Sequence, residues 1–299
     1  MLLLNKKQVT GDLFPNKEIS LNVPKTMLVD GIQTIKLAFE NNEDLMKLHF
    51  LVYHLKDTLG QDARIILDLH YVPYSRSDRP MLERTFSLKA LCAFINNLGF
   101  YKVNVYEPHS DVTIMGINNI VVKNTTMMVA LLALQKIYPN APQDTYKQKE
   151  LLDFMMDNNI WFICPDNGAE KRYTQQILEI NPRFSNIRTC TKERELSTGR
   201  IKRFMLADSL DTDNIKHAII LDDLCSKGGT FILCAKALKE KYSMLERVDL
   251  CITHCETNIF NGDIPTTDLI QNVFITDSMP LPNISASNKI ILCPVENYL

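Results

Sequence analysis

The sequence predicts an α/β protein whose sheets are mainly parallel and flanked by helices. Short apolar runs rich in β-branched residues recur along the chain, segments with helical spacing lie between them, and this alternation occurs twice. Near-continuous apolar runs are typical of strands that are covered on both faces, as in parallel sheets. The 299 residues suffice for two domains of about 150 residues each.

The elements can be placed in chain order from these patterns. Helical spacing, as of Leu48, Leu51 and Leu55, predicts helices over 44–58, 87–98 and 231–242. The polar stretch 139–144 is the predicted join, which gives an N-terminal domain of residues 1–140 and a C-terminal domain of residues 141–299. Ligands of such sheets bind beyond the carboxyl ends of strands, so the loops after the strands are candidate sites. The predicted strands are 63–69, 102–106, 160–164, 218–221, 248–252 and 273–276.

Composition narrows the class of protein. A hydrophobic fraction of 45% and a charged fraction of 23% are ordinary for a globular chain. A net charge of -2 argues against a general nucleic-acid binder, although it allows a local basic pocket. No apolar stretch reaches the roughly 18 residues of a membrane span, and the apolar run after Met1 is too short for a signal peptide. The eight cysteines lie mostly in apolar runs that are typical of buried thiols, which favours a soluble cytoplasmic protein without a zinc site.

The clearest chemical signal lies at residues 218–230. An apolar strand ends in Asp222 and Asp223, and a short polar loop leads to Gly228-Gly229-Thr230 at the start of a helix. Glycine lets backbone N–H groups approach phosphate oxygens, and the helix N-terminus attracts anions. The two carboxylates repel phosphate but accept hydrogen bonds from vicinal hydroxyls. The combination predicts a site for a phosphorylated ribose; the alternative is a strand–turn–helix connection that needs glycine only for its geometry.

This segment resembles the ribose-binding motif of type I phosphoribosyltransferases and of ribose-phosphate diphosphokinases, the PRPP synthetases. Other motifs resemble only the diphosphokinases. Tyr74-Ser75-Arg76-Ser77-Asp78-Arg79 is similar to their ATP-site segment, with Ser77 where the family has Gln. Phe14-Pro15-Asn16-Lys17-Glu18 is similar to their adenine-pocket motif, which reaches a neighbouring subunit. The resemblance therefore implies an ATP site made by Phe14, Asn16, Glu18, Arg76, Ser77 and Asp78.

Three further segments carry the resemblance. Tyr106-Glu107-Pro108-His109 ends a strand where the family has a His at the Mg²⁺–triphosphate site, so His109 is a candidate for metal binding and catalysis. The segment from Cys164 to Arg172 is similar to a family motif whose Asp, here Asp166, binds Mg²⁺ or ribose. Lys192 and Arg194 match the two cations of the family's flexible catalytic loop; each of these groups alone would be taken as a solvated or structural feature.

The resemblance extends from Phe14 to the end of the chain and implies a function. It implies two tandem phosphoribosyltransferase-like domains that use ATP and Mg²⁺ to transfer pyrophosphate to the C1 hydroxyl of a 5-phosphorylated ribose, releasing AMP. Lys192 and Arg194 then stabilise the transferring group, while Asp222, Asp223, Ser226, Lys227, Gly228, Gly229 and Thr230 hold the sugar. The family also forms homodimers that assemble into hexamers or other rings.

The loop departs from the family pattern at two positions. Ser226 replaces an Asp and Lys227 replaces a Thr, which removes one negative charge and adds one positive charge. The acceptor is then either ribose 5-phosphate, giving PRPP, or the more anionic ADP-ribose, giving ADP-ribose 1-pyrophosphate for NAD metabolism. Two other functions stay open: a catalytically silent regulatory homologue, and a transferase that joins PRPP to a base. The presence of Lys192, Arg194, His109 and Asp166 argues against the silent homologue. The motifs at Phe14 and Arg76 argue against the transferase, because such an enzyme needs no ATP site.

Overall fold

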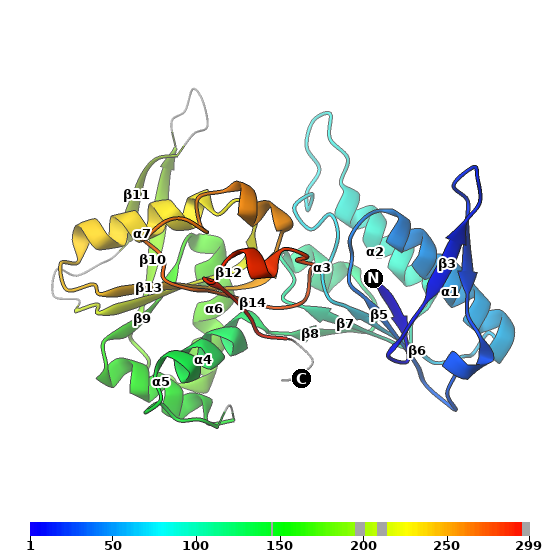
Figure 1. The fold of residues 1–299 in the computed structure, drawn as a ribbon, viewed down its shortest axis with the longest axis horizontal. Helices are drawn as coiled ribbons and strands as arrows, with labels where there is room; N and C mark the ends of the chain where they lie inside the picture. The colour runs from blue at the N-terminus through cyan, green and yellow to red at the C-terminus, as the bar shows by residue number, and fades with distance from the viewer. Residues whose placement is uncertain (145, 195–200, 208–213, 295–299) are drawn as a thin grey trace. The chain divides into compact units, whose positions relative to one another are not determined.

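A computed structural model describes residues 1–144, 146–194, 201–207 and 214–294, with only the backbone given for 192–194, 201–204, 207 and 286. The chain forms two compact units (Figure 1). The first comprises Met1–Asn124 with Ser278–Pro280, and the second comprises Thr125–Asp277 with Leu281–Leu299. The domain boundary at residues 140 and 141 stays a prediction, and helix α4 (Thr126–Ile137) packs in the core of the second unit.

The first unit contains a six-stranded sheet in the order β2-β1-β5-β6-β7-β8. Strands β5 to β8 are parallel, and the short β1 pairs antiparallel with both β2 and β5. The parallel strands are β5 (Gln33–Leu37), β6 (Ile65–Leu69), β7 (Lys102–Tyr106) and β8 (Ile120–Lys123), and the antiparallel ones are β1 (Leu2–Leu4) and β2 (Lys7–Gln8).

One face of this sheet carries the core of the first unit. Alternate residues such as Ile35, Leu67 and Val105 point into it, because side chains alternate between the faces of a strand. They pack against α1 (Glu43–Leu59) and α2 (Ser87–Leu98). The residues between them in β5 and β6 are half-buried, so the second face of this sheet is covered less completely than the first.

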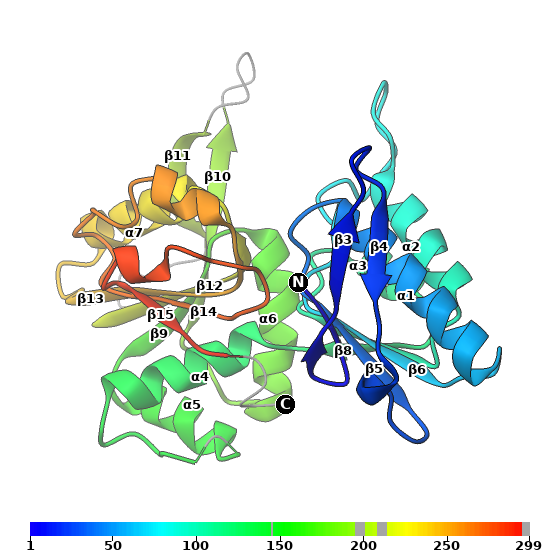
Figure 2. The ribbon, with the colours of Figure 1, turned by 45° about the vertical axis from the view of Figure 1, so that its right-hand side comes forward.

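The remaining elements of the first unit pack next to these two helices or connect to them. A hairpin of β3 (Thr10–Leu13) and β4 (Ile19–Asn22) contacts α1 (Figure 2). A short 3-10 helix, η1 (Lys25–Met27), follows it. Helix α3 (Asp111–Gly116) follows β7 and begins at Ser110, whose hydroxyl accepts a hydrogen bond from Val112 N.

The second unit contains a seven-stranded sheet in the order β11-β10-β9-β12-β13-β14-β15. All neighbouring strands from β10 to β15 are parallel, and β11 is antiparallel to β10. The strands are β9 (Ile160–Cys164), β10 (Ile187–Arg194), β11 (Ile201–Ala207), β12 (His217–Cys225), β13 (Arg247–Cys255), β14 (Val273–Ile275) and β15 (Ile290–Leu292).

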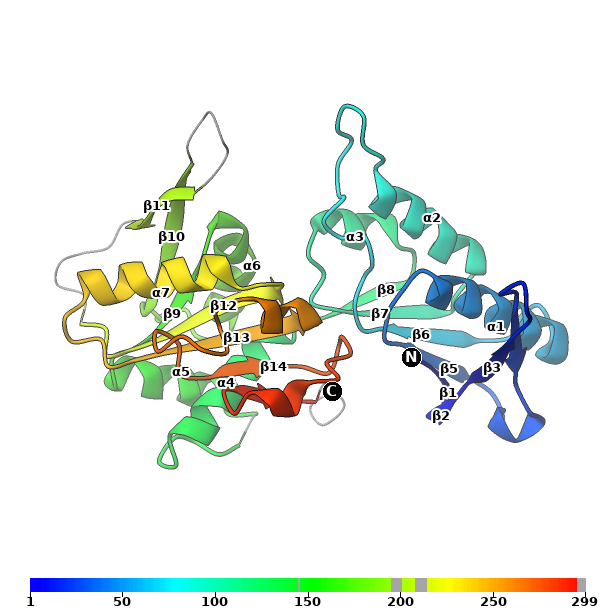
Figure 3. The same cartoon turned by 45° about the horizontal axis from the view of Figure 1, so that its top comes forward.

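Helices cover both faces of this second sheet (Figure 3). Ile219 and Leu221 of β12 point into a core shared with α4, α5 (Gln148–Asp157) and α6 (Asn167–Ile180). Ala218 and Ile220 point the other way, toward α7 (Gly229–Lys241). The near-continuous apolar run of β12 therefore reflects burial on both faces, as parallel strands require. Short 3-10 helices η2 (Thr257–Asn261) and η3 (Ile284–Ala286) lie near the end of the chain.

The predicted fold class is confirmed, since both large sheets are mainly parallel and flanked by helices. Each of the six predicted strands corresponds to a strand of the structure. All eight cysteines are buried thiols. Within the described ranges, no helix is both long and apolar enough to cross a membrane.

Candidate active site

The connection between β12 and α7 is the centre of the predicted acceptor site. Helix α7 begins after Gly228, which has a left-handed backbone conformation with φ 79° and ψ 10°. A Cβ at this position would also collide with the side chain of Ile264. Only glycine meets both requirements without strain, so the local sequence dictates this sharp entry into the helix. Its N-terminal N–H groups form the kind of terminus that attracts anions.

The segment 256–264 packs directly behind this loop. Asn258 Nδ2 donates a hydrogen bond to Ser226 Oγ over 3.2 Å. A Cβ on Gly262 would collide with the carbonyl group of Lys227. The Lys227 side chain is exposed, whereas Ser226 is half-buried. The two residues that depart from the family pattern therefore differ: the Ser226 hydroxyl is held by the protein, and the Lys227 ammonium group faces solvent.

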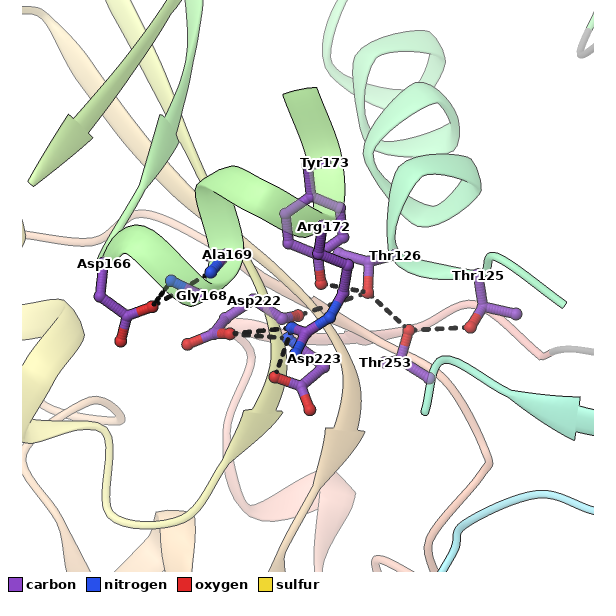
Figure 4. A network of polar contacts seen from close by, with 10 residues as sticks. All are labelled: Thr125, Thr126, Asp166, Gly168, Ala169, Arg172, Tyr173, Asp222, Asp223 and Thr253. Atoms are coloured by element: carbon purple, nitrogen blue, oxygen red, sulfur yellow. Dashed lines mark hydrogen bonds and ion pairs between the residues drawn. The ribbon is translucent and has the colours of Figure 1, made fainter. Parts of the chain in front are cut away.

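The two acids of the loop lie in unequal surroundings (Figure 4). The Asp223 side chain is 3% exposed, and its Oδ1 accepts a hydrogen bond from Arg172 Nη1 over 2.9 Å. The Asp222 side chain is 17% exposed, and its Oδ1 lies 3.8 Å from the same nitrogen. The backbone N–H of Asp223 donates to Asp222 Oδ1 over 2.9 Å. Asp223 is thus paired within the protein, and Asp222 is the more accessible acceptor.

The charges around Asp222 oppose its ionisation. Burial raises the pKa of Asp222 well above its usual range, and the carboxylates of Asp223 and Asp166 raise it further, while Arg172 lowers it. A ligand hydroxyl or a cation that approaches this carboxylate would relieve part of that penalty. Strongly perturbed acids of this kind are common at functional sites.

A chain of buried hydroxyl groups lies beside the acids (Figure 4). The hydroxyl of Tyr173 donates to Thr126 Oγ1 over 3.1 Å, and Thr126 Oγ1 lies 2.8 Å from Thr253 Oγ1. Thr253 Oγ1 also lies 2.9 Å from Thr125 Oγ1. Thr126 donates to the Asp222 carbonyl oxygen over 3.4 Å. Because buried polar groups are costly when unpaired, this chain fixes α4, α6 and β12 relative to one another.

Asp166 marks the start of α6. Its Oδ1 accepts hydrogen bonds from Gly168 N and Ala169 N, each over 3.1 Å, so this carboxylate caps the helix. It also contributes to the negative potential at Asp222. Among the residues that the structure describes, no group of three or more His, Cys, Asp and Glu side chains could hold a metal ion. A preformed metal cage is therefore absent from the described residues, and the metal-binding role of Asp166 stays a prediction.

Lys192 and Arg194 lie at the end of β10, where their backbones pair with Phe204 and Ile201 of β11. Their side chains lie outside the described residues, as does the segment 195–200 that joins the two strands. Their catalytic role stays a prediction.

In the first unit, the loops after β6 and β7 meet at Asp78. Its carboxylate accepts a hydrogen bond from Arg79 Nε over 2.9 Å. This bond and one from Ser110, beside His109, lower the pKa of Asp78, although partial burial opposes them. His109 itself is half-buried, and Arg76 is exposed. The loops therefore bring Asp78 close to the neighbour of His109, as their shared position at the carboxyl ends of parallel strands predicts.

Ser77, which replaces the family Gln, fixes the end of this loop. Its hydroxyl donates to the Thr85 carbonyl oxygen over 2.8 Å, and its own carbonyl oxygen accepts from Leu88 N over 3.2 Å. Ser77 thereby secures the start of α2, while a contact with ATP stays a prediction.

The remaining predicted ATP residues occupy the exposed tip of the β3–β4 hairpin. Phe14 is 56% exposed, and Asn16 and Glu18 are exposed as well. Hydrogen bonds from Phe14 N to Glu18 O and from Glu18 N to Asn16 Oδ1 hold the turn in shape. The tip thus presents an aromatic ring and polar groups to solvent on a preformed turn.

Two contacts of the acceptor site do not follow from the sequence motifs. Arg172 ends the segment that contains Asp166, where the motif gives it no role, and Asn258 belongs to none of the motifs. Arg172 lies six residues after Asp166 on a helix, so its direction toward Asp223 depends on tertiary packing. Local patterns do not reveal such a contact.

Comparison with known proteins supports the resemblance. The chain aligns with the ribose-phosphate pyrophosphokinase of Haemophilus ducreyi at 25% identity, covering 100% of this chain and 87% of that protein. The enzyme of that name from Bacillus caldolyticus is also 25% identical, over 93% of this chain and 80% of that protein. The resemblance to ribose-phosphate pyrophosphokinases is confirmed.

Other comparisons define the extent of this likeness. A 135-residue part is 34% identical to the chloroplastic ribose-phosphate pyrophosphokinase 3 of rice, covering 42% of this chain and 29% of that protein. The structure of phosphoribosylpyrophosphate synthetase from Mycobacterium smegmatis matches with a TM-score of 0.71 and 16% identity, over 97% of this chain and 87% of that one. That similarity establishes the same fold. No family model matches the chain.

Proposed function

We propose that this protein is an ATP-dependent diphosphokinase of the ribose-phosphate pyrophosphokinase type. It transfers the β,γ-pyrophosphate of ATP to the C1 hydroxyl of a 5-phosphorylated ribose and releases AMP. The observation that carries the proposal is the pair Asp222–Asp223 at the end of β12, followed by a glycine-led helix N-terminus. Acids that accept from hydroxyls, next to N–H groups that bind phosphate, fit this class of acceptor. The full-length similarity to enzymes of that name supports it.

The reaction requires positioning and charge neutralisation more than covalent catalysis. The C1 oxygen forms a bond to the β-phosphorus, the bond from that phosphorus to the α,β-bridging oxygen breaks, and the hydroxyl proton is released. Asp222 orients the ribose by accepting from its hydroxyls, and the start of α7 binds the 5-phosphate. Lys192 and Arg194 neutralise the charge that develops on the transferring group. The residues 14–18 and 76–78 bind ATP.

The residues present are compatible with Mg²⁺, which favours oxygen ligands and usually takes only one or two carboxylates from the protein. Asp166 supplies such an oxygen, and its negative charge adds to burial and to the neighbouring Asp223 in raising the pKa of Asp222. Asp166 in the second unit and His109 in the first are the proposed metal-binding residues. When bound, Mg²⁺ neutralises the phosphate charge of ATP.

The proposal includes two acceptors, ribose 5-phosphate and ADP-ribose. Ser226 removes a negative charge from the loop, and the exposed ammonium group of Lys227 adds a positive one. Both changes make the loop more positive, which favours binding of a 5-substituent with more phosphate charge. Assembly into a homodimer or larger ring would allow the exposed Phe14 tip to reach a neighbouring ATP site.

The test is an AMP assay. The protein is incubated with ATP and Mg²⁺, and with no acceptor, ribose 5-phosphate or ADP-ribose. Acceptor-dependent AMP, together with the matching 1-pyrophosphate, supports the proposal and identifies the acceptor. AMP formed equally without acceptor indicates simple hydrolysis and contradicts it, and a complete lack of AMP favours a silent regulatory subunit.

The catalytic cations give a sharper version of this test. We expect Lys192→Ala and Arg194→Ala each to lower kcat on the order of 10²–10³-fold, because each removes one charge from the transition state. Binding of ATP, measured by calorimetry, should change little. Lys236→Ala, which removes an exposed cation on α7, is the matched control. Near-normal turnover in either variant would rule out these two residues as catalytic cations.

A further inference from the structure

Arg172 connects the acids of the acceptor site to helix α6. Its side chain is 18% exposed, and its guanidinium group donates to Asp223 Oδ1 over 2.9 Å, while Asp222 Oδ1 lies 3.8 Å away (Figure 4). One cation therefore serves two adjacent carboxylates, but it contacts them unequally. The buried Asp223 receives the direct hydrogen bond, and the more exposed Asp222 receives only longer-range attraction.

The position of Arg172 is fixed on both sides along the helix. Before it, Asp166 caps the start of α6 through two backbone N–H groups. After it, the fully buried Tyr173 donates its hydroxyl hydrogen to Thr126 Oγ1. Since Thr126 also donates to the Asp222 carbonyl oxygen, the same anchor holds the helix and the strand that carries the acids. The packing of α6 against β12 therefore fixes the distances from Arg172 to the two carboxylates.

We propose that Arg172 is a positioning residue for the acceptor: it anchors Asp223 in the wall of the site and leaves Asp222 to receive the sugar hydroxyls. The inference rests on the proposed function and assigns different roles to two adjacent acids that the sequence motif does not distinguish. Asp223 is a support whose Oδ1 accepts the hydrogen bond of Arg172. Asp222 is the contact with the ligand.

The charge of Arg172 has a second effect on Asp222. It lowers the pKa of that carboxyl against the larger effects of burial and the neighbouring acids. A variant without the guanidinium group should therefore hold the proton of Asp222 up to a higher pH. Because a protonated carboxyl accepts hydrogen bonds poorly, the acidic limb of kcat/KM for the acceptor should move to higher pH.

Arg172→Gln and Arg172→Lys test the proposal in the full-length protein. Glutamine keeps some hydrogen-bonding capacity without charge, and lysine restores the charge without the planar fork. We expect Arg172→Gln to raise KM for the acceptor about tenfold or more, since a charge-assisted contact is lost. We expect KM for ATP to change less than about twofold and the acidic limb of kcat/KM for the acceptor to move to higher pH. Arg172→Lys should partly reverse the rise in KM for the acceptor and the shift of the acidic limb.

The outcome is decided by comparing substrates and by the pH profile. A merely structural Arg172 would lower the thermal midpoint and the amount of active enzyme, but would leave both KM values and the pH limb unchanged; that result overturns the proposal. If the wild-type protein forms no acceptor-dependent AMP, the proposed function fails. The inference is then decided by calorimetric binding of ribose 5-phosphate: weaker binding by Arg172→Gln than by wild type supports it, whereas equal binding, or none by either protein, overturns it.

Discussion

The predicted acceptor residues of the second unit and the predicted ATP residues of the first unit are held in different ways. Asp222 and Asp223 lie in a buried network with Arg172, and the hydroxyl groups of Thr126 and Tyr173 support them. Phe14, in contrast, stands on an exposed hairpin tip that is held mainly by backbone hydrogen bonds. The acceptor acids are therefore fixed in position before any ligand binds, whereas the hairpin tip exposes its ring and polar groups to solvent.

This difference has a physical origin. Two adjacent carboxylates repel each other, and burial adds a desolvation cost, so they need a fixed cation and fixed donors to remain in place. An aromatic ring on a turn carries no such cost in water. Stability and function are therefore coupled at the acceptor acids and separable at the hairpin.

Asp222→Asn should change activity and stability in opposite directions at the acceptor site. We expect kcat/KM for the acceptor to fall on the order of 100-fold, because the ionised acceptor of the sugar hydroxyls is lost. The thermal midpoint at neutral pH should rise. The folded-state pKa of Asp222 is raised, so ionising this group above its unfolded pKa destabilises the fold, and the neutral amide avoids that penalty.

The measurements are initial rates and thermal unfolding between pH 4 and pH 8. Wild-type stability relative to the variant should decrease as pH rises from the unfolded pKa of about 3.9 toward the raised folded value. A variant that is both active and less stable would show that Asp222 is a structural acid, and the comparison between the two regions would fail.

Gly228→Ala and Gly229→Ala form a matched pair of variants in the phosphate loop, residues 222–230 between β12 and α7. Gly228 has a positive φ and faces Ile264, whereas a Cβ on Gly229 has no heavy atom within 4 Å. We expect Gly228→Ala to lower the free energy of unfolding by about 2 kcal/mol or more, from backbone strain and overpacking. Gly229→Ala, at the first position of α7, should change it by no more than about 0.5 kcal/mol. Denaturant unfolding measures both changes, and equal losses of unfolding free energy in the two variants would contradict the described geometry.

Phe14→Ser should have the smallest effect on stability. Its side chain is 56% exposed, so we expect the free energy of unfolding to change by no more than about 0.5 kcal/mol. If the ring stacks on adenine as proposed, KM for ATP should still rise several-fold. Tyr53→Ser is the control, since this aromatic on α1 is 57% exposed and lies on a different surface element. An equal rise of KM for ATP in both variants would argue against a specific role for Phe14.

Much of the fold and part of the site follow from local sequence patterns. The apolar run of β12, the two acids and the paired glycines are contiguous, so their arrangement could be predicted. The first sheet was harder to predict, because β1 spans only three residues and is too short to show an alternating pattern. The pairing of Arg172 with Asp223 joins positions 51 residues apart, and that of Asn258 with Ser226 joins positions 32 apart. Such pairs depend on how helices and loops pack, which no local pattern records.

The phosphate loop and the segment behind it fit together closely enough to restrict how either can change. The Ser226 hydroxyl accepts a hydrogen bond from the Asn258 amide, and the Lys227 carbonyl group leaves room only for glycine at position 262. Gly228 and Ile264 restrict each other in the same way. In homologous sequences these positions should covary as three pairs. A redesign of acceptor preference should therefore exchange residues 226–228 and 256–264 together as one cassette.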